Sequence, residues 1–219
     1  MPIPQGQTSA AGRATPLLTL LSTALLVGCT GLLTGPSAAP PSTYLLAPAL
    51  PATPATASTG HPKGPSLLVS LPESAAGYDG RRMAYLERDF RIDYFADHEW
   101  IDSPANLLRP LLVQALEGAG VFGAVSADGH GIQGELRLDT VIEALHQDFR
   151  VRPSQVLLKL RLRLVDPSSG RILASQVLEE VEAAPADDPY GGVVALNRAL
   201  SRLLPRTVAF VVTNVRRVK

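Results

Sequence analysis

The sequence has few of the residues that would point to a particular chemistry. It contains a single cysteine, so no disulfide bond can form within the chain. Its 20 basic residues are balanced by 20 acidic residues, whereas a nucleic-acid-binding protein usually carries a basic excess that meets phosphate. Aromatic residues occupy 5% of the 219 positions, and Trp100 is the only tryptophan. The composition therefore excludes an internal disulfide and argues against nucleic acid as a partner.

Motifs of common catalytic and metal sites are missing as well. The chain has no Gly-x-Ser-x-Gly elbow and no phosphate-cradling glycine loop, and Gly191-Gly192 is too short and isolated for a nucleotide site. Asp97-His98-Glu99 contains two acids and a histidine, but consecutive residues rarely converge on one ion. The other histidines are scattered along the chain: His61, His130 and His146. We therefore expect no enzyme activity, no catalytic residue, no metal and no cofactor, and we place His98 and Glu99 in a solvated loop.

The N-terminus has the pattern of an export signal. One charge, Arg13, precedes an almost wholly apolar run from Leu17 to Val27. This run is too short to span a bilayer, which takes about 20 apolar residues, but it has the length of the apolar part of a signal peptide. It ends in Leu26-Val27-Gly28-Cys29, which resembles the lipobox of bacterial lipoproteins. Residues 1–28 are therefore predicted to be a lipoprotein signal peptide, with cleavage between Gly28 and Cys29.

Cys29 would then be the lipidated first residue of the mature protein. The alternative interpretation is a buried free cysteine, which packs as a small apolar residue. Thr30 follows Cys29, whereas lipoproteins of the enterobacterial type that stay at the inner membrane have Asp there. This difference favours the outer membrane, with the protein on its periplasmic face and held by acyl chains that each contribute about 0.8 kcal/mol per buried CH₂.

Residues 29–65 are predicted to be the lipidated cysteine and a flexible tether. The segment is rich in Pro, Ala, Ser, Thr and Gly, and it cannot bury enough apolar surface to fold alone. Tyr44-Leu45-Leu46 interrupts this composition. An aromatic-aliphatic island inside a spacer favours an edge strand that docks on the folded domain, with a mobile tail as the alternative.

The rest of the chain predicts one α+β domain over residues 66–213, followed by a basic tail over 214–219. We expect a mainly antiparallel sheet with two helices packed on one face. Strands are predicted at 67–71, 82–86, 91–95, from 121, and at 134–144, 155–165 and 171–181. The strands 82–86 and 91–95 should form a hairpin with a polar turn at residues 87–89.

Two helices are indicated by capping residues and apolar spacing. The first should begin with Ser103 as N-cap and Pro104 at its first position, and end near Gly118. The second should begin after Asp187 or Asp188 and run to about residue 204, because a proline follows there and stops or bends a helix.

The two longest predicted strands alternate strictly between apolar and charged residues. In 155–165 the leucines at 158, 160, 162 and 164 share one face, and Lys159, Arg161 and Arg163 share the other. In 134–144 the other, mostly acidic face carries Glu135, Arg137, Asp139, Val141 and Glu143. Such a pattern is typical of a sheet with one covered face and one wet face, and antiparallel pairing would set acids beside bases.

Several segments together resemble the ABC-type transport auxiliary lipoprotein family, which includes paraquat-inducible-type members. They are Tyr44-Leu45-Leu46 after the lipobox, Arg82–Tyr85, Asp93–Trp100 with Pro104 following, and the helix 193–200. The resemblance implies a non-catalytic auxiliary lipoprotein of a lipid transport system built around mammalian cell entry (MCE) domain proteins. Its partners would be an MCE-domain protein and ABC transporter subunits, and it could also form a homo-oligomer.

Tyr94, Phe95 and Trp100 are the candidate partner-binding residues within the most specific of these segments. Tyr94 and Phe95 should point to opposite faces of a strand. Trp100 is either an exposed anchor for a partner or a core residue beside the helix start. Two other functions stay open: a lipid carrier whose own apolar cavity is lined by the leucine-rich strands, and a periplasmic hydrolase, for which no nucleophile and base can be named.

Overall fold

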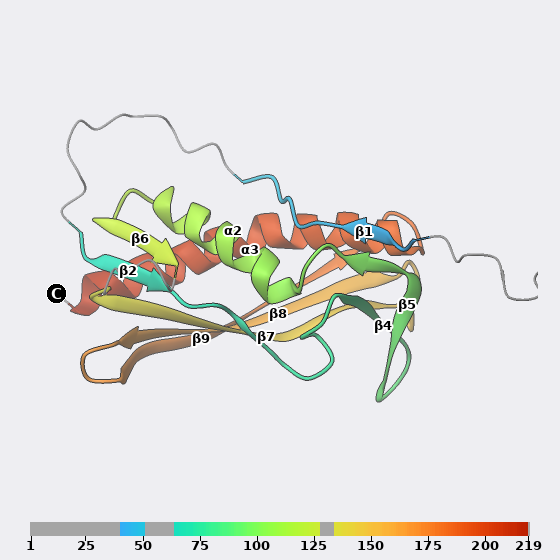
Figure 1. Cartoon of the computed structure of the whole chain (residues 1–219), viewed down its shortest axis with the longest axis horizontal. Helices are drawn as coiled ribbons and strands as arrows, with labels where there is room; N and C mark the ends of the chain where they lie inside the picture. The colour runs from blue at the N-terminus through green and yellow to red at the C-terminus, as the bar shows by residue number, and fades with distance from the viewer. Residues whose placement is uncertain (1–39, 51–63, 128–133, 219) are drawn as a thin grey trace, which may run out of the picture. The chain divides into compact units, whose positions relative to one another are not determined.

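The structure is a computed structural model that describes residues 40–50, 64–127 and 134–218. Cys29, Gly28 and the predicted signal peptide lie outside the described residues. Within them, the chain forms two helices, α2 (Pro104–Glu117) and α3 (Pro189–Val218), and a nine-stranded mixed sheet (Figure 1). Both helices cover the same face of the sheet, as Figure 1 shows. The predicted α+β class is therefore confirmed.

Three long strands form the main part of the sheet. They are β7 (Leu136–Asp148), β8 (Gln155–Asp166) and β9 (Arg171–Ala183), and they pair antiparallel in chain order. The predicted alternation is confirmed, because the leucines of β8 at 158, 160, 162 and 164 are at most 1% exposed and face the helices. On the other face, Arg161 Nε lies 2.5 Å from Glu143 Oε1 across the β7–β8 pair. Charged side chains thus follow the wet face.

Six shorter strands complete the sheet. They are β1 (Ser42–Tyr44), β2 (Ser66–Val69), β3 (Glu73–Ser74), β4 (Arg82–Arg88), β5 (Arg91–Trp100) and β6 (Ala124–Ala127). β4 and β5 form the predicted antiparallel hairpin, but β2, β3 and β4 each pair with β7 in parallel. Parallel pairing requires crossover connections, and β2, β3 and β4 reach β7 by such connections and not by hairpins. The sheet is therefore mixed.

The Tyr44-Leu45-Leu46 island docks on the domain as an edge strand, as predicted. β1 pairs in parallel with the end of β5, with Ser42 opposite His98 and Tyr44 opposite Trp100. Leu46, just after β1, is buried in the core. The folded part of the chain therefore begins before the predicted boundary at residue 66.

β5 is longer than expected. The sequence placed His98 and Glu99 in a solvated loop, but these residues continue the strand to Trp100. The correction has a tertiary cause, because β1 pairs with this stretch and Arg81 binds Glu99 from the other side at 2.5 Å.

The start of each helix follows the predicted capping residues. Ser103 Oγ accepts a hydrogen bond from the backbone N–H of Asn106 at 3.4 Å, and Pro104 is the first residue of α2. Asp188 Oδ1 accepts one from the Gly191 N–H at 2.6 Å, and Pro189 begins α3. Side-chain acceptors at these positions satisfy backbone donors that have no partner within the helix.

The end of α3 differs from the prediction. We expected the helix to end near Leu204 and residues 214–219 to form a basic tail, but α3 continues through Pro205 to Val218. A proline inside a helix costs about 3 kcal/mol. Phe210, Val211 and Val215 are buried in the core, and each such side chain contributes about 1.5–3 kcal/mol. Their burial together exceeds the cost of the proline, so packing extends the helix.

Neither helix of the described segments combines the length and the apolar character needed to cross a membrane.

Candidate docking site on strands β1, β4 and β5

Half-buried aromatic side chains form a continuous row at the end of the sheet where β1, β4 and β5 lie. We call it the aromatic row; it consists of Tyr44, His98, Phe95, Tyr85 and Phe149. The centroids of neighbouring rings are 4.5–6.1 Å apart, which is the usual range for aromatic pairs in contact. One end of the row is fixed by a hydrogen bond of 2.9 Å between Tyr44 Oη and His98 Nδ1.

Four separate segments of the chain build the aromatic row. Parallel pairing of β1 with β5 brings Tyr44 to His98, and the β4–β5 hairpin sets Tyr85 beside the strand that carries Phe95. Phe149 follows β7, and its backbone N–H donates to the Leu86 carbonyl at 2.8 Å. The sequence pointed to Phe95, but it gave no signal for Tyr85 and Phe149, because their approach depends on β4 pairing with β7.

Tyr94 lies apart from the aromatic row, as the prediction of opposite strand faces requires. Its hydroxyl donates a hydrogen bond of 3.2 Å to the Gly77 carbonyl. The guanidinium carbon of Arg82 lies 3.8 Å from the centroid of its ring, within cation–π distance. Tyr94 is thus only half-buried and is engaged with its own domain.

Trp100 is buried, at 3% exposure, and packs within the core. Its position fits the core interpretation and not that of an exposed anchor. The cavity beside it has a volume of about 20 Å³ and is lined by Met83, His146 and Leu196, among others. A space of this size is close to that of one water molecule and far below that of an acyl chain.

A buried polar pair lies close to Trp100. Tyr78 Oη and His146 Nδ1 are 2.9 Å apart, and both side chains are less than 10% exposed. Burial lowers the pKa of His146, because removal from water disfavours the charged imidazolium. Burial likewise raises the pKa of Tyr78. Both groups are therefore neutral at pH 7, and the pair supports the fold without adding a charge.

A network of ion pairs ties the β4–β5 turn to the β7–β8 turn. Arg150 binds Asp148 at 2.8 Å on its own strand end, and it also binds Asp89 in the β4–β5 turn. The hydrogen bond from Arg150 lowers the pKa of Asp148. Arg152 binds Asp187 at 2.7 Å on the far side of the same turn. The pair of Arg150 with Asp89 therefore holds the β4–β5 turn to the β7–β8 turn.

The tip of the β4–β5 hairpin exposes an apolar residue that sequence reasoning missed. We expected a polar turn at residues 87–89, but the turn consists of Asp89 and Phe90, and the Phe90 side chain is fully exposed. The backbone of Phe90 has a φ of +64°, in the left-handed region. An aromatic residue directly after a polar turn was the signal that could have found it.

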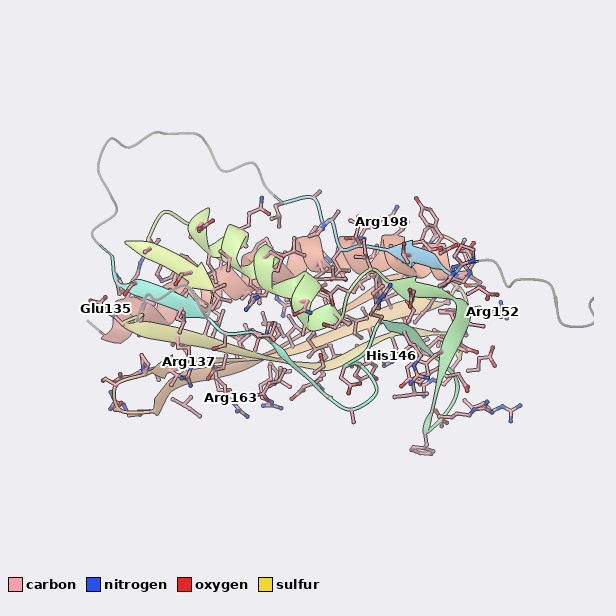
Figure 2. All side chains as sticks on the ribbon, viewed as in Figure 1. Glu135, Arg137, His146, Arg152, Arg163 and Arg198 are labelled. Carbon is pink, nitrogen blue, oxygen red and sulfur yellow. The ribbon has the colours of Figure 1, made fainter. Side chains whose placement is uncertain are left out.

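The basic residues predicted on the wet face of β8 are mostly paired. Lys159 lies 3.5 Å from Glu179, and Arg161 binds Glu143. Figure 2 shows Arg137 and Arg163 on the sheet face that the helices leave uncovered. Among the residues that the structure describes, no three His, Cys, Asp or Glu side chains gather as a metal site would require.

The chain matches the model of a known protein family. The model of the ABC-type transport auxiliary lipoprotein component family matches residues 44–207, from β1 into α3. The chain therefore belongs to this family, and it is an auxiliary lipoprotein component of ABC-type transport. Lipoproteins are held at a membrane by their acyl chains. A comparison with curated protein sequences found no match.

Solved structures share the fold. Protein XCC0632 from Xanthomonas campestris has a TM-score of 0.70 at 18% identity, over 80% of this chain and 98% of that one. An uncharacterized protein has a TM-score of 0.60 at 13% identity, over 79% of this chain and 99% of that one. At such identities the likeness concerns the fold alone.

Proposed function

We propose that this protein is a periplasmic lipoprotein, acylated at Cys29 and anchored in the outer membrane, that serves an MCE-type ABC lipid transport system by docking to its proteins. It contacts an MCE-domain protein or the ABC transporter subunits and catalyses no reaction. Family membership supplies the transport role, and the observation that supports docking is the aromatic row. The choice of membrane rests on Thr30 after Cys29.

The aromatic row has the properties of a protein-binding surface. Its rings are only half-buried, and their neighbours hold them in place, so binding a partner would cost little side-chain entropy. Aromatic residues are enriched among the residues that dominate binding energy at interfaces. We assign the contact to Phe95, which lies in the middle of the row, with Tyr85 and Phe149 at its sides.

The arrangement of the core disfavours the alternative, a lipid carrier with its own cavity. The leucines that would line such a cavity pack against α3 and are at most 1% exposed. The cavity beside Trp100 is about 20 Å³, whereas sites for drug-sized ligands usually have about 300–1,000 Å³. Helix and strands would have to separate before an acyl chain could enter.

Affinity isolation of the full-length protein from its native envelope tests the docking function. We expect the wild-type chain to recover an MCE-domain protein or the transporter's membrane subunits. Phe95→Ala should lower that recovery about 10-fold or more, as the loss of a central interface residue does. Val177→Ala is the matched control, because Val177 is a partly exposed apolar residue of β9, away from the aromatic row.

Melting temperatures of the two variants separate docking from folding. The docking function is contradicted if wild-type protein repeatedly recovers unrelated proteins only, or if both variants lose the partner equally. Native mass spectrometry of the full-length protein tests the carrier alternative. We expect no lipid beyond the covalent acyl chains, and a co-purified, non-covalent lipid would favour a carrier.

A further inference from the structure

The tip of the β4–β5 hairpin combines two unfavourable features at one residue. Phe90 is the second residue of a two-residue turn, with a φ of +64°, where glycine or asparagine is usual and a bulky side chain is disfavoured. Its ring is fully exposed, so no burial within the domain offsets the backbone conformation. A strained residue that its own domain does not stabilise points to a function at that residue.

The path of the chain places the tip at the same end of the domain as the entry to β1. β1 runs parallel to the last residues of β5, so the chain enters β1 from the side on which β5 approaches this pairing. Ser42 pairs with His98, seven residues after Arg91 at the tip, which corresponds to about 24 Å along the strand. Figure 1 shows the β4–β5 hairpin and the entry to β1 at the same end, with the hairpin extending away from the helices.

The length of chain between Cys29 and the domain permits contact of the tip with the same bilayer. Eleven residues, 30–40, separate Cys29 from Pro41. Such a segment spans at most about 40 Å when fully extended. This reach exceeds the distance of about 24 Å along β5, so the domain can lie with the hairpin tip on the membrane surface. Contact of the tip with this bilayer depends on the acylation of Cys29 proposed above.

The chemistry of the tip suits a lipid surface. Ile92, two residues after Phe90, is also partly exposed, and Arg88 and Arg91 are the pair of residues that flanks the turn. Apolar side chains that enter the acyl region, with guanidinium groups at the level of the phosphates, are typical of segments that bind membrane interfaces. Asp89 and Asp93 pair with arginines and keep the local charge small. Insertion of the ring therefore matters more here than attraction of charge.

We propose that Phe90 is a membrane-contacting residue, whose ring inserts at the boundary of headgroups and acyl chains in the bilayer that holds Cys29. Together, the anchor and the tip give the domain a fixed orientation on the membrane. The aromatic row then lies close to the bilayer, where a membrane-bound partner can reach it.

Spin labelling of the full-length, acylated protein tests this inference. Cys29 is the only cysteine and carries the acyl chain, so Phe90→Cys supplies one free thiol for a nitroxide. The protein is inserted through its acyl chains into vesicles of phosphatidylethanolamine and phosphatidylglycerol. We expect the ratio of collision rates with oxygen and with a water-soluble nickel chelate to be several-fold higher at position 90 than in the control Ile172→Cys. Ile172 is also apolar and exposed, and it lies next to the β8–β9 turn, at the other end of the sheet (Figure 1).

The outcomes distinguish the two proposals. If the protein floats with the vesicles and the label at position 90 collides with nickel as freely as the label at 172, the inference about Phe90 is overturned and the anchor stands. A chain that does not float with vesicles overturns the acylation, and the inference about Phe90 with it. Phe90→Gly provides a check on strain, since we expect its melting temperature to equal or exceed that of the wild type.

Discussion

His146 is a buried titratable residue whose protonation affects the stability of this fold. Its pKa lies below the ordinary value near 6.5 because burial removes water from the imidazole. At a pH between about 6.5 and the lower pKa of the folded state, His146 binds a proton in the unfolded chain but not in the folded chain. The free energy of unfolding should therefore decrease as the pH falls below about 6.5. The decrease is at most about 1.4 kcal/mol per pH unit, the limit for a single proton.

Urea unfolding at pH 7.5 and pH 5.5, followed by the fluorescence of Trp100, measures this effect. The control is His146→Gln, which removes the titrating group and should make the two midpoints more similar. The Asp148 carboxyl does not interfere, because its lowered pKa moves its own loss of stabilisation below about pH 4. Equal pH dependence in both proteins would contradict the role given to His146.

Leu160 tests the dry core at the scale of one side chain. It is 0% exposed, and its side chain lies on the face of β8 that the helices cover. Leu160→Ala should lower the free energy of unfolding by about 2–5 kcal/mol, through lost burial and the cavity that remains. Ile172→Ala, at an exposed position, should change it by no more than about 0.5 kcal/mol. If Leu160→Ala were as mild as the control, the strands would not pack against α3 as described.

α3 is an element whose first turn depends on its cap. Gly191 and Gly192 lie in this turn and disfavour a helix, yet a side chain at Gly192 would collide with the Gln147 amide of β7. Glycine at this position lowers the helix propensity but allows α3 to pack closely against β7. Asp188 supports the turn by accepting the Gly191 N–H.

Removal of this cap should have a measurable cost. We expect Asp188→Ala to lower the free energy of unfolding by about 0.5–2 kcal/mol, because one backbone N–H loses its acceptor. Asp188→Ser, which can still accept that hydrogen bond, should retain most of the stability. Chemical denaturation of the three proteins compares them, and equal values for Asp188→Ala and the wild type would show that the cap contributes little.

At the scale of the whole molecule, Cys29 should determine where the protein resides. Cys29→Ala removes the thiol that would carry the lipid, so we expect no incorporation of labelled fatty acid, whereas the wild-type chain should be labelled. Intact-mass analysis of envelope material should show a wild-type chain that begins at Cys29. An unacylated thiol with an uncut leader in wild-type protein would contradict the anchoring.

Thr30 gives a separate test of which membrane holds the protein. In hosts with enterobacterial sorting, Thr30→Asp should leave acylation intact and move the protein from outer-membrane to inner-membrane fractions of a density gradient. A wild-type chain already in the inner-membrane fraction would contradict the proposed location while leaving the lipid anchor in place.

Local patterns determined much of this protein from its sequence. Alternation along β7 and β8 gave the antiparallel strands and their buried leucines, since side chains of a strand alternate between two faces. Ser103 and Asp188 gave the helix starts, because caps act within one turn. The family resemblance also came from the sequence, and the family match over residues 44–207 confirms it.

Only the tertiary structure decided the features that depend on distant segments. α3 passes Pro205 because buried residues beyond it offset the proline, which no local rule reveals. β5 extends through His98 because β1, more than 50 residues earlier, supplies its neighbour. The aromatic row exists because β4 and β5 pair beside β7. Such contacts depend on the free energy of the whole packed sheet. The residues next to one another in sequence do not determine this free energy.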